Sequence, residues 1–176
     1  MDDVDRHARL EAWFRAYGDR VFAYLLHRTD RETAQDVLQE VFVTAFRRAA
    51  DVPEPPIGWL LGAARRQLAN TSRGNHRRDR LAAHVAANGS GPIADESLAA
   101  GAVTDALAQL STGDREVLTL SAWYELSADE AAQALGCSRS AYAVRLHRAR
   151  HRLADRMRAA GYGSPRPHHL PEAVSD

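Results

Sequence analysis

Apolar side chains recur at helical spacing near the middle of the first half of the chain. Between residues 34 and 46 each apolar residue has others three or four positions away: Ala34, Val37, Leu38, Val41, Phe42, Ala45 and Phe46. This spacing predicts an amphipathic helix with one buried face. Asp30 can cap its N-terminus, and a proline-rich segment at residues 53–56 lies beyond its end.

Similar apolar stripes flank this helix on both sides. Upstream, one or two further helices are marked by Trp13, Phe14, Tyr17, Val21, Tyr24 and Leu25. Downstream, another helix begins with Trp59, Leu60, Ala63, Ala64 and Leu68. No segment alternates between apolar and polar residues as a half-buried strand would. We therefore predict an all-α fold, in which large aromatic side chains supply a small core for the first part of the chain.

The second part of the chain contains a helix-turn-helix pattern. Ser127 and Glu130 are spaced as a capping box, and Gly136 follows where a helix end needs a left-handed residue. Ser138 can cap a second helix that runs to about Arg158, with one apolar face formed by Tyr142, Leu146, Ala149 and Leu153. In a DNA-binding helix-turn-helix the second helix enters the major groove. The alternative for this pattern is a plain helical hairpin.

Turn-forming residues separate the two parts. Residues 88–92, Asn-Gly-Ser-Gly-Pro, are the least suited to regular structure in the interior of the chain. We predict two small helical domains, at residues 6–80 and 97–160, joined by a flexible linker at 81–96. The Gly- and Pro-rich tail at 161–176 is predicted to be disordered.

Composition narrows the class of protein. The chain has 176 residues, of which 45% are hydrophobic and 26% are charged, as in ordinary globular proteins. A single cysteine excludes a disulfide framework and a cysteine-based zinc site. No apolar run approaches the ~18 residues of a membrane span, and the acidic start does not resemble a secretory signal. The expected compartment is the cytoplasm.

The net charge of zero conceals a strong segregation of charge. All 23 basic residues are arginines. The net charge is −3 over residues 2–56, +5 over 57–80, −7 over 91–138 and +6 over 139–158. Basic blocks of this kind favour binding to a polyanion, although two solvated helix faces would give the same pattern.

Three stretches, taken in order and spacing, resemble bacterial sigma factors of the extracytoplasmic-function (ECF) type. They are residues 34–42 (Ala-Gln-Asp-Val-Leu-Gln-Glu-Val-Phe), residues 59–66 (Trp-Leu-Leu-Gly-Ala-Ala-Arg-Arg), and residues 110–153 with the helix-turn-helix. The resemblance covers about residues 10–158. It implies a transcription initiation factor that binds core RNA polymerase, directs it to specific promoters and helps to open the DNA. It implies no enzymatic activity and no cofactor.

The resemblance implies that the helix predicted at residues 34–46 binds the clamp coiled coil of the polymerase β′ subunit. If the stripe at residues 34–42 faces the core, a second face carries Asp36, Gln39, Glu40 and Val43. Two carboxylates, an amide and an exposed valine suit a partner helix rich in arginine. Taken without the rest of the sequence, the same face could be merely solvated.

The resemblance assigns the basic end of the first domain to the minus-ten promoter element. The candidate residues are Arg65, Arg66, Gln67, Asn70, Arg73, Arg77 and Arg78. The arginines can neutralise phosphates, and the two amides can hydrogen-bond a base edge. Trp59 could stack on a base, but its place at the start of an amphipathic helix favours a core position.

The resemblance assigns the helix-turn-helix to the minus-thirty-five element. The candidates are Ser138, Arg139, Ser140, Tyr142, Arg145 and Arg148. An arginine that forms two hydrogen bonds to guanine discriminates between bases by about 1–3 kcal/mol. Tyr142 is equally compatible with the core. Many family members carry Thr-Val-Lys-Ser where this chain has Ala-Tyr-Ala-Val at 141–144, so the base preference cannot be transferred.

The implied partners are core RNA polymerase (through the β′ clamp and the β flap), promoter DNA and an anti-sigma factor that could hold the protein at the membrane. No small-molecule substrate, metal or direct membrane insertion is expected. Two other functions fit part of the pattern. A sigma mimic that sequesters an anti-sigma factor would not need the basic blocks. A stand-alone helix-turn-helix regulator would not need the acidic face.

Overall fold

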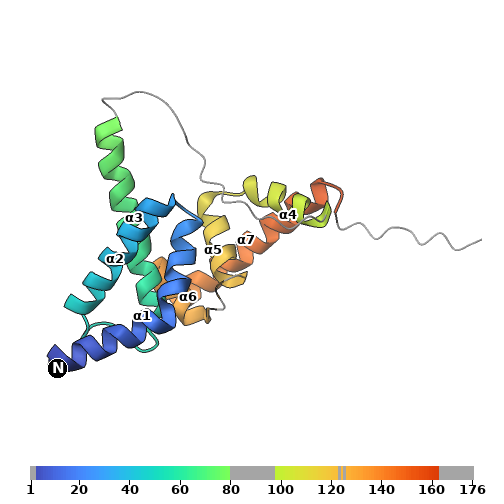
Figure 1. The fold of residues 1–176 in the computed structure, drawn as a ribbon. Coiled ribbons are helices and arrows are strands. Elements are labelled where there is room, and N and C mark those ends of the chain that lie inside the picture. The colour runs from blue at the N-terminus through green and yellow to red at the C-terminus, as the bar shows by residue number, and fades with distance from the viewer. Residues whose placement is uncertain (1–2, 80–97, 123, 125, 163–176) are drawn as a thin grey trace, which may run out of the picture.

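The computed structural model describes residues 3–79, 98–122, 124 and 126–162, and all regular structure within them is α-helical. The first lobe comprises α1 (Asp3–Leu26), α2 (Arg31–Arg47) and α3 (Ile57–Asp79), as Figure 1 shows. The second lobe comprises α4 (Leu98–Ala108), α5 (Thr112–Ala122), α6 (Ala128–Leu135) and α7 (Arg139–Ala159). The all-α prediction is confirmed.

Parts of the predicted organisation fall outside the described residues. The predicted linker at 81–96 lies there, as does the predicted tail from residue 163 onward. None of the helices in the described ranges has a stretch long and apolar enough to cross a bilayer.

Helix α2 begins at its predicted cap. The Asp30 carboxylate accepts a hydrogen bond of 2.9 Å from the backbone N–H of Thr33. This bond holds the pKa of Asp30 below its usual value. The predicted apolar stripe faces the core, with Ala34, Val37, Val41, Phe42 and Ala45 buried.

The upstream stripe forms the single helix α1, in which Trp13, Val21, Tyr24 and Leu25 are buried. Phe14 of the same stripe is 53% exposed, and its ring meets that of Phe42 in a T-shaped contact with the centroids 5.0 Å apart. Trp13 and Phe14 point about 100° apart on the helix, and at this point of α1 it is Trp13 that takes the buried side.

The helix-turn-helix forms as its caps predict. The Ser127 hydroxyl accepts from the backbone N–H of Glu130, and the Glu130 carboxylate accepts from the backbone N–H of Ser127. Gly136 ends α6 in the left-handed conformation with φ of 64°. The Ser138 hydroxyl then accepts from the backbone N–H of Ala141 and caps α7. The predicted order of cap, turn and recognition helix is confirmed.

Removal of the capping box should destabilise this lobe. We expect Ser127→Ala to lower the free energy of unfolding by about 1 kcal/mol, because a backbone N–H at the start of α6 loses its acceptor. The midpoint of urea unfolding measures this loss. Ser127→Asp keeps an acceptor and should retain most of the stability. An equal loss in both variants would show that the cap does not stabilise the lobe.

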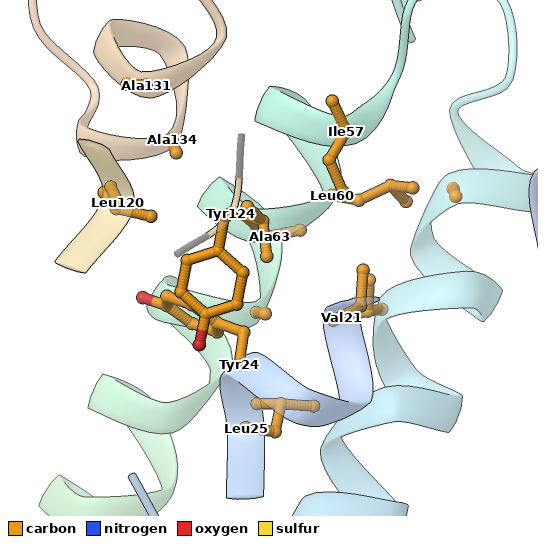
Figure 2. Packing of buried hydrophobic residues seen from close by; sticks show 14 of the residues in the cluster. Val21, Tyr24, Leu25, Ile57, Leu60, Ala63, Leu120, Tyr124, Ala131 and Ala134 are labelled. Atoms are coloured by element: carbon orange, nitrogen blue, oxygen red, sulfur yellow. The ribbon is translucent and has the colours of Figure 1, made fainter. Parts of the chain in front are cut away.

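One apolar core runs through both lobes rather than a separate core in each. Figure 2 shows Leu120, Ala131 and Ala134 of the second lobe beside Ile57 and Leu60 of the first, and all five are buried. Helix α6 packs more extensively on α3 than on α7, its partner in the helix-turn-helix. The fold therefore places candidate surfaces from the two lobes next to each other.

Candidate functional site

The acidic face of α2, formed by Asp36, Gln39, Glu40 and Val43, is fully available at the surface. All four side chains are exposed, and Val43 is 42% exposed although it is apolar. They lie on the side of α2 opposite the buried stripe. The helical register thus brings together the four residues that the sequence predicted as one face.

In the basic part of α3, some side chains are exposed to solvent and one binds a residue of the second lobe. Arg66 and Asn70 are exposed, and Gln67 is half-buried. Arg65 donates from Nε to both carboxylate oxygens of Glu116 in α5, at 3.1 and 3.2 Å. The side chains of three further predicted residues lie outside the described part of the chain, although their backbone continues α3: Arg73, Arg77 and Arg78.

Trp59 packs against the apolar core at the start of α3 and is only partly exposed. The core position predicted for this tryptophan is confirmed.

The N-terminal half of α7 presents polar side chains to solvent. Ser140, Arg145 and Arg148 are exposed. Arg139 forms an exposed ion pair of 3.2 Å with Asp129 of α6. Ser138 is exposed as well, with its hydroxyl engaged in the cap. The predicted base-reading residues therefore share the exposed start of one helix, except for Tyr142.

Tyr142, which the sequence left open between a DNA contact and the core, lies in the core. Its side chain is 3% exposed and belongs to the apolar core. It lies on the same face of α7 as Ala149, which is also buried, so the ring packs inside the helix-turn-helix. A DNA contact would need to withdraw a large aromatic side chain from that core.

Further along α7, two arginines bind side chains of α5. Arg152 donates to both carboxylate oxygens of Asp114 at 2.8 and 2.9 Å, and Arg150 donates to the Ser121 hydroxyl at 3.2 Å. Part of the basic block at residues 139–158 thus anchors α7 to α5.

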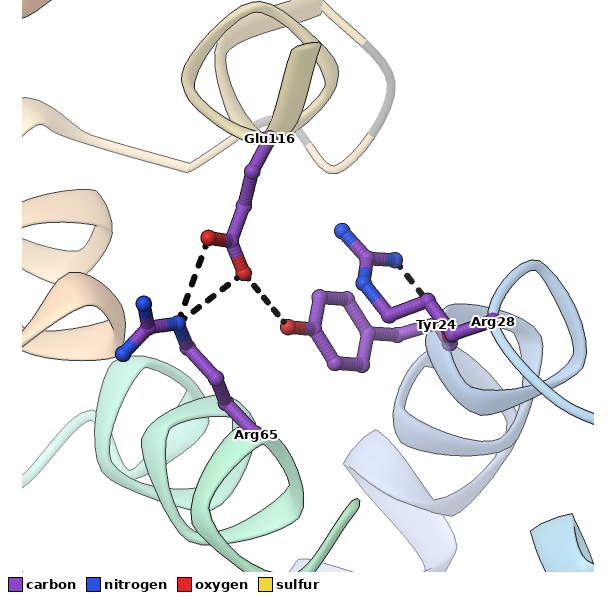
Figure 3. Close-up of polar contacts among 4 residues, drawn as sticks. All are labelled: Tyr24, Arg28, Arg65 and Glu116. Carbon is purple, nitrogen blue, oxygen red and sulfur yellow. Dashed lines mark hydrogen bonds and ion pairs between the residues drawn. The ribbon is translucent and has the colours of Figure 1, made fainter. Parts of the chain in front are cut away.

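A polar cluster joins the two lobes, as Figure 3 shows. The Tyr24 hydroxyl donates to Glu116 at 3.1 Å, on the carboxylate that also accepts from Arg65. The Arg28 guanidinium lies over the ring of Tyr24, with its central carbon 3.6 Å from the ring centroid. Burial raises the pKa of Tyr24 well above its usual value, and the neighbouring Glu116 adds to the rise.

Alkaline pH should therefore destabilise the folded chain. The unfolded chain releases the Tyr24 proton near pH 10, whereas the folded chain retains it. The stability that the protonated Tyr24 contributes is fully present below about pH 10. It is lost as the pH rises further toward the pKa of Tyr24 in the folded chain. The urea midpoint should drop between pH 8 and pH 11, and it should drop less in Tyr24→Phe. An identical drop in that variant would exclude Tyr24 as the cause.

Sequence reasoning missed the residues that join the lobes. Glu116 lies 51 positions from Arg65 and 92 from Tyr24 along the chain, so no local pattern connects them. Gly58 and Gly62 carry a weak signal, because two glycines one turn apart on a predicted helix permit close approach of a second helix.

Two known protein families match this chain, one in each lobe. The description "Sigma-70 region 2" matches residues 13–78, and "Sigma-70, region 4" matches residues 100–153. The ECF RNA polymerase sigma factor SigD of Mycobacterium tuberculosis is 33% identical over 138 residues. The alignment covers 73% of this chain and 65% of SigD, so the chain spans slightly less than two thirds of that curated relative.

Solved structures share the fold. The sigma factor RpoE of Bartonella quintana, solved in complex with the anti-sigma factor NepR, superposes with a TM-score of 0.62 at 20% identity. That match covers 84% of this chain and 96% of RpoE. CnrH, solved in complex with the cytosolic domain of CnrY, superposes with a TM-score of 0.56 at 23% identity and covers 87% of this chain and 90% of CnrH.

Proposed function

The chain belongs to the ECF sigma factors of the sigma-70 family, with regions 2 and 4, and on that basis we propose that it directs core RNA polymerase to specific promoters. The observation that carries the proposal is the combination of an exposed acidic face on α2 with an exposed basic helix-turn-helix in one chain. The family is not enzymatic, so the chain supplies recognition and the polymerase supplies the chemistry.

The first step of the proposed function is binding to the β′ clamp. The acidic face of α2 presents Asp36 and Glu40 one turn apart, with Val43 a further turn along. An arginine-rich helix can meet both carboxylates, while the valine covers apolar surface. The β flap is the proposed partner of the second lobe.

The second step is recognition of promoter DNA. We assign the minus-ten element to α3, where Arg66 and Asn70 are exposed, and the minus-thirty-five element to the start of α7. There Arg145 and Arg148 can reach base edges or phosphates, and the capped N-terminus of α7 orients them. The exposed arginines of α3 and α7 can neutralise DNA phosphates, so we expect the binding to weaken as the salt concentration rises.

An anti-sigma factor is the proposed regulator. RpoE, which shares this fold, was solved with the anti-sigma factor NepR, and CnrH, which shares it as well, was solved with the cytosolic domain of CnrY. The proposed role places the protein with polymerase and DNA in the cytoplasm.

Association with core polymerase tests the proposal. Purified chain and core enzyme should co-elute as a one-to-one complex in size-exclusion chromatography, and excess of another sigma factor should displace the chain. A folded chain that never co-elutes with core polymerase would overturn the proposal in favour of a sigma mimic or a stand-alone regulator.

A further inference from the structure

One apolar side chain lies on the outer surface of the recognition helix α7. Val144 is 49% exposed, and among the large hydrophobic residues that the structure describes in the second lobe, only Tyr162 is exposed as well. A β-branched residue is a weaker helix former than alanine, and a valine that is half exposed gains little from the core. Neither helix stability nor packing therefore explains a valine at this position of the free chain.

The side chain of Val144 points away from the core of the helix-turn-helix. It lies two positions from Tyr142 and two from Leu146, both of which pack in the apolar core. Since successive residues on an α-helix are about 100° apart, Val144 lies nearly opposite both of them. Ser140 and Arg148 lie about one turn before and one turn after Val144, and both are exposed. Val144 is thus the apolar middle of an exposed line of side chains.

The chemistry of a base edge limits what a valine can read. In the major groove, guanine, cytosine and adenine present hydrogen-bonding groups, whereas thymine adds a C5-methyl group beside its one acceptor. A valine has no donor or acceptor, so a polar base edge covered by it would lose hydrogen bonds to water and gain none. The thymine methyl group is the one apolar substituent that the valine side chain can cover without this cost.

We propose that Val144 is a specificity-determining residue that packs on the C5-methyl group of a thymine in the minus-thirty-five element. The inference rests on the proposed function, in which the start of α7 lies in the major groove. It adds a second kind of recognition to that of the arginines. Arg145 and Arg148 would bind hydrogen-bonding groups or phosphates, whereas Val144 would recognise a methyl group. The element that this chain prefers should therefore contain a thymine, on one strand or the other, opposite Val144.

Replacement of thymine by deoxyuridine tests this contact, because the two bases differ only in the methyl group. Holoenzyme assembled from the full chain and core polymerase first selects its preferred element from templates with a randomised upstream region. Each thymine of that element, on either strand, is then replaced singly by deoxyuridine. At one position we expect the affinity of the holoenzyme to fall about fourfold, which is what burial of one methyl or methylene group contributes.

A valine variant separates the protein contact from effects of the methyl group on the DNA itself. Serine and valine have similar helix propensities, so Val144→Ser should fold like wild type. Its holoenzyme should bind the thymine and deoxyuridine templates equally, whereas Val144→Ile should keep the fourfold difference. Val4→Ser in α1 is the matched control, because it makes the same change at a valine that is 72% exposed in the first lobe. This control should also keep the difference.

Four results would overturn the proposal. The selected element could contain no thymine, or wild-type holoenzyme could bind the deoxyuridine templates as tightly as the thymine template at every position. Val144→Ser could show the same loss as wild type, which would assign the effect to the DNA alone, or Val4→Ser could lose the difference as Val144→Ser does. Failure of the proposed function is seen earlier and separately. In that case the chain does not bind core polymerase, or the selection yields no shared upstream sequence, and the inference falls with it.

Discussion

Reversal of two charges on α2 is expected to abolish binding to core polymerase. In Asp36→Arg/Glu40→Arg, two positive side chains would face a partner helix rich in arginine. Each such juxtaposition of like charges costs several kcal/mol, so we expect the affinity to fall by at least ~100-fold. Titration of labelled chain with core enzyme measures the loss, and transcription should disappear with it.

The same substitutions should leave the fold intact. Asp36 and Glu40 are exposed, and neither forms an ion pair with any residue that the structure describes. The matched control is Glu11→Arg/Asp19→Arg on α1, which reverses two exposed carboxylates elsewhere on the first lobe. Unchanged polymerase affinity in the α2 variant, or equal losses in both variants, would remove the acidic face from the interface.

The second large effect is expected in the recognition helix. Arg145→Ala should relax sequence preference at one position of the minus-thirty-five element, because a bidentate contact to guanine would be lost. The preference should fall by about 5- to 150-fold, which corresponds to about 1–3 kcal/mol. Transcription from a library of templates with a randomised upstream element measures the preference position by position.

Arg156→Ala supplies the comparison for Arg145. Arg156 is exposed near the C-terminal end of α7, about three turns from Arg145. Its loss should weaken all templates about equally and reduce the salt dependence of binding. If Arg156→Ala changed the preferred sequence and Arg145→Ala did not, the orientation of α7 in the groove would be the reverse of the one proposed.

The local elements of this fold are readable from the sequence because their causes are local. Asp30, the Ser127–Glu130 pair, Gly136 and Ser138 each act within a few residues, and each begins or ends a helix as predicted. The acidic face follows from helical periodicity once the buried stripe is known.

Tyr142 is a position where local sequence patterns point to two different roles. The sequence places it on the apolar face with Leu146 and Ala149, and also at the start of the recognition helix, where DNA contacts are made. The structure shows that the apolar face decides its position. A buried aromatic ring of this size contributes a large apolar area to a small core.

The association of the lobes could not be predicted because it depends on residues far apart in the chain. The charge blocks suggested a polyanion as the partner of the arginines. Some of those arginines instead pair with the chain's own acidic block, as Arg65 does with Glu116 and Arg152 with Asp114. The exposed arginines that remain, such as Arg66 and Arg148, carry the proposed DNA contacts.

Transcription in vitro with purified core polymerase on sheared genomic DNA of the source organism tests the central claim most directly. The 5′ ends of the RNA are sequenced with and without the chain, and the Asp36→Arg/Glu40→Arg variant serves as the negative control. We predict start sites that need the chain and share a two-part upstream motif. No new start sites, with folded chain and active polymerase, would contradict a role in promoter selection.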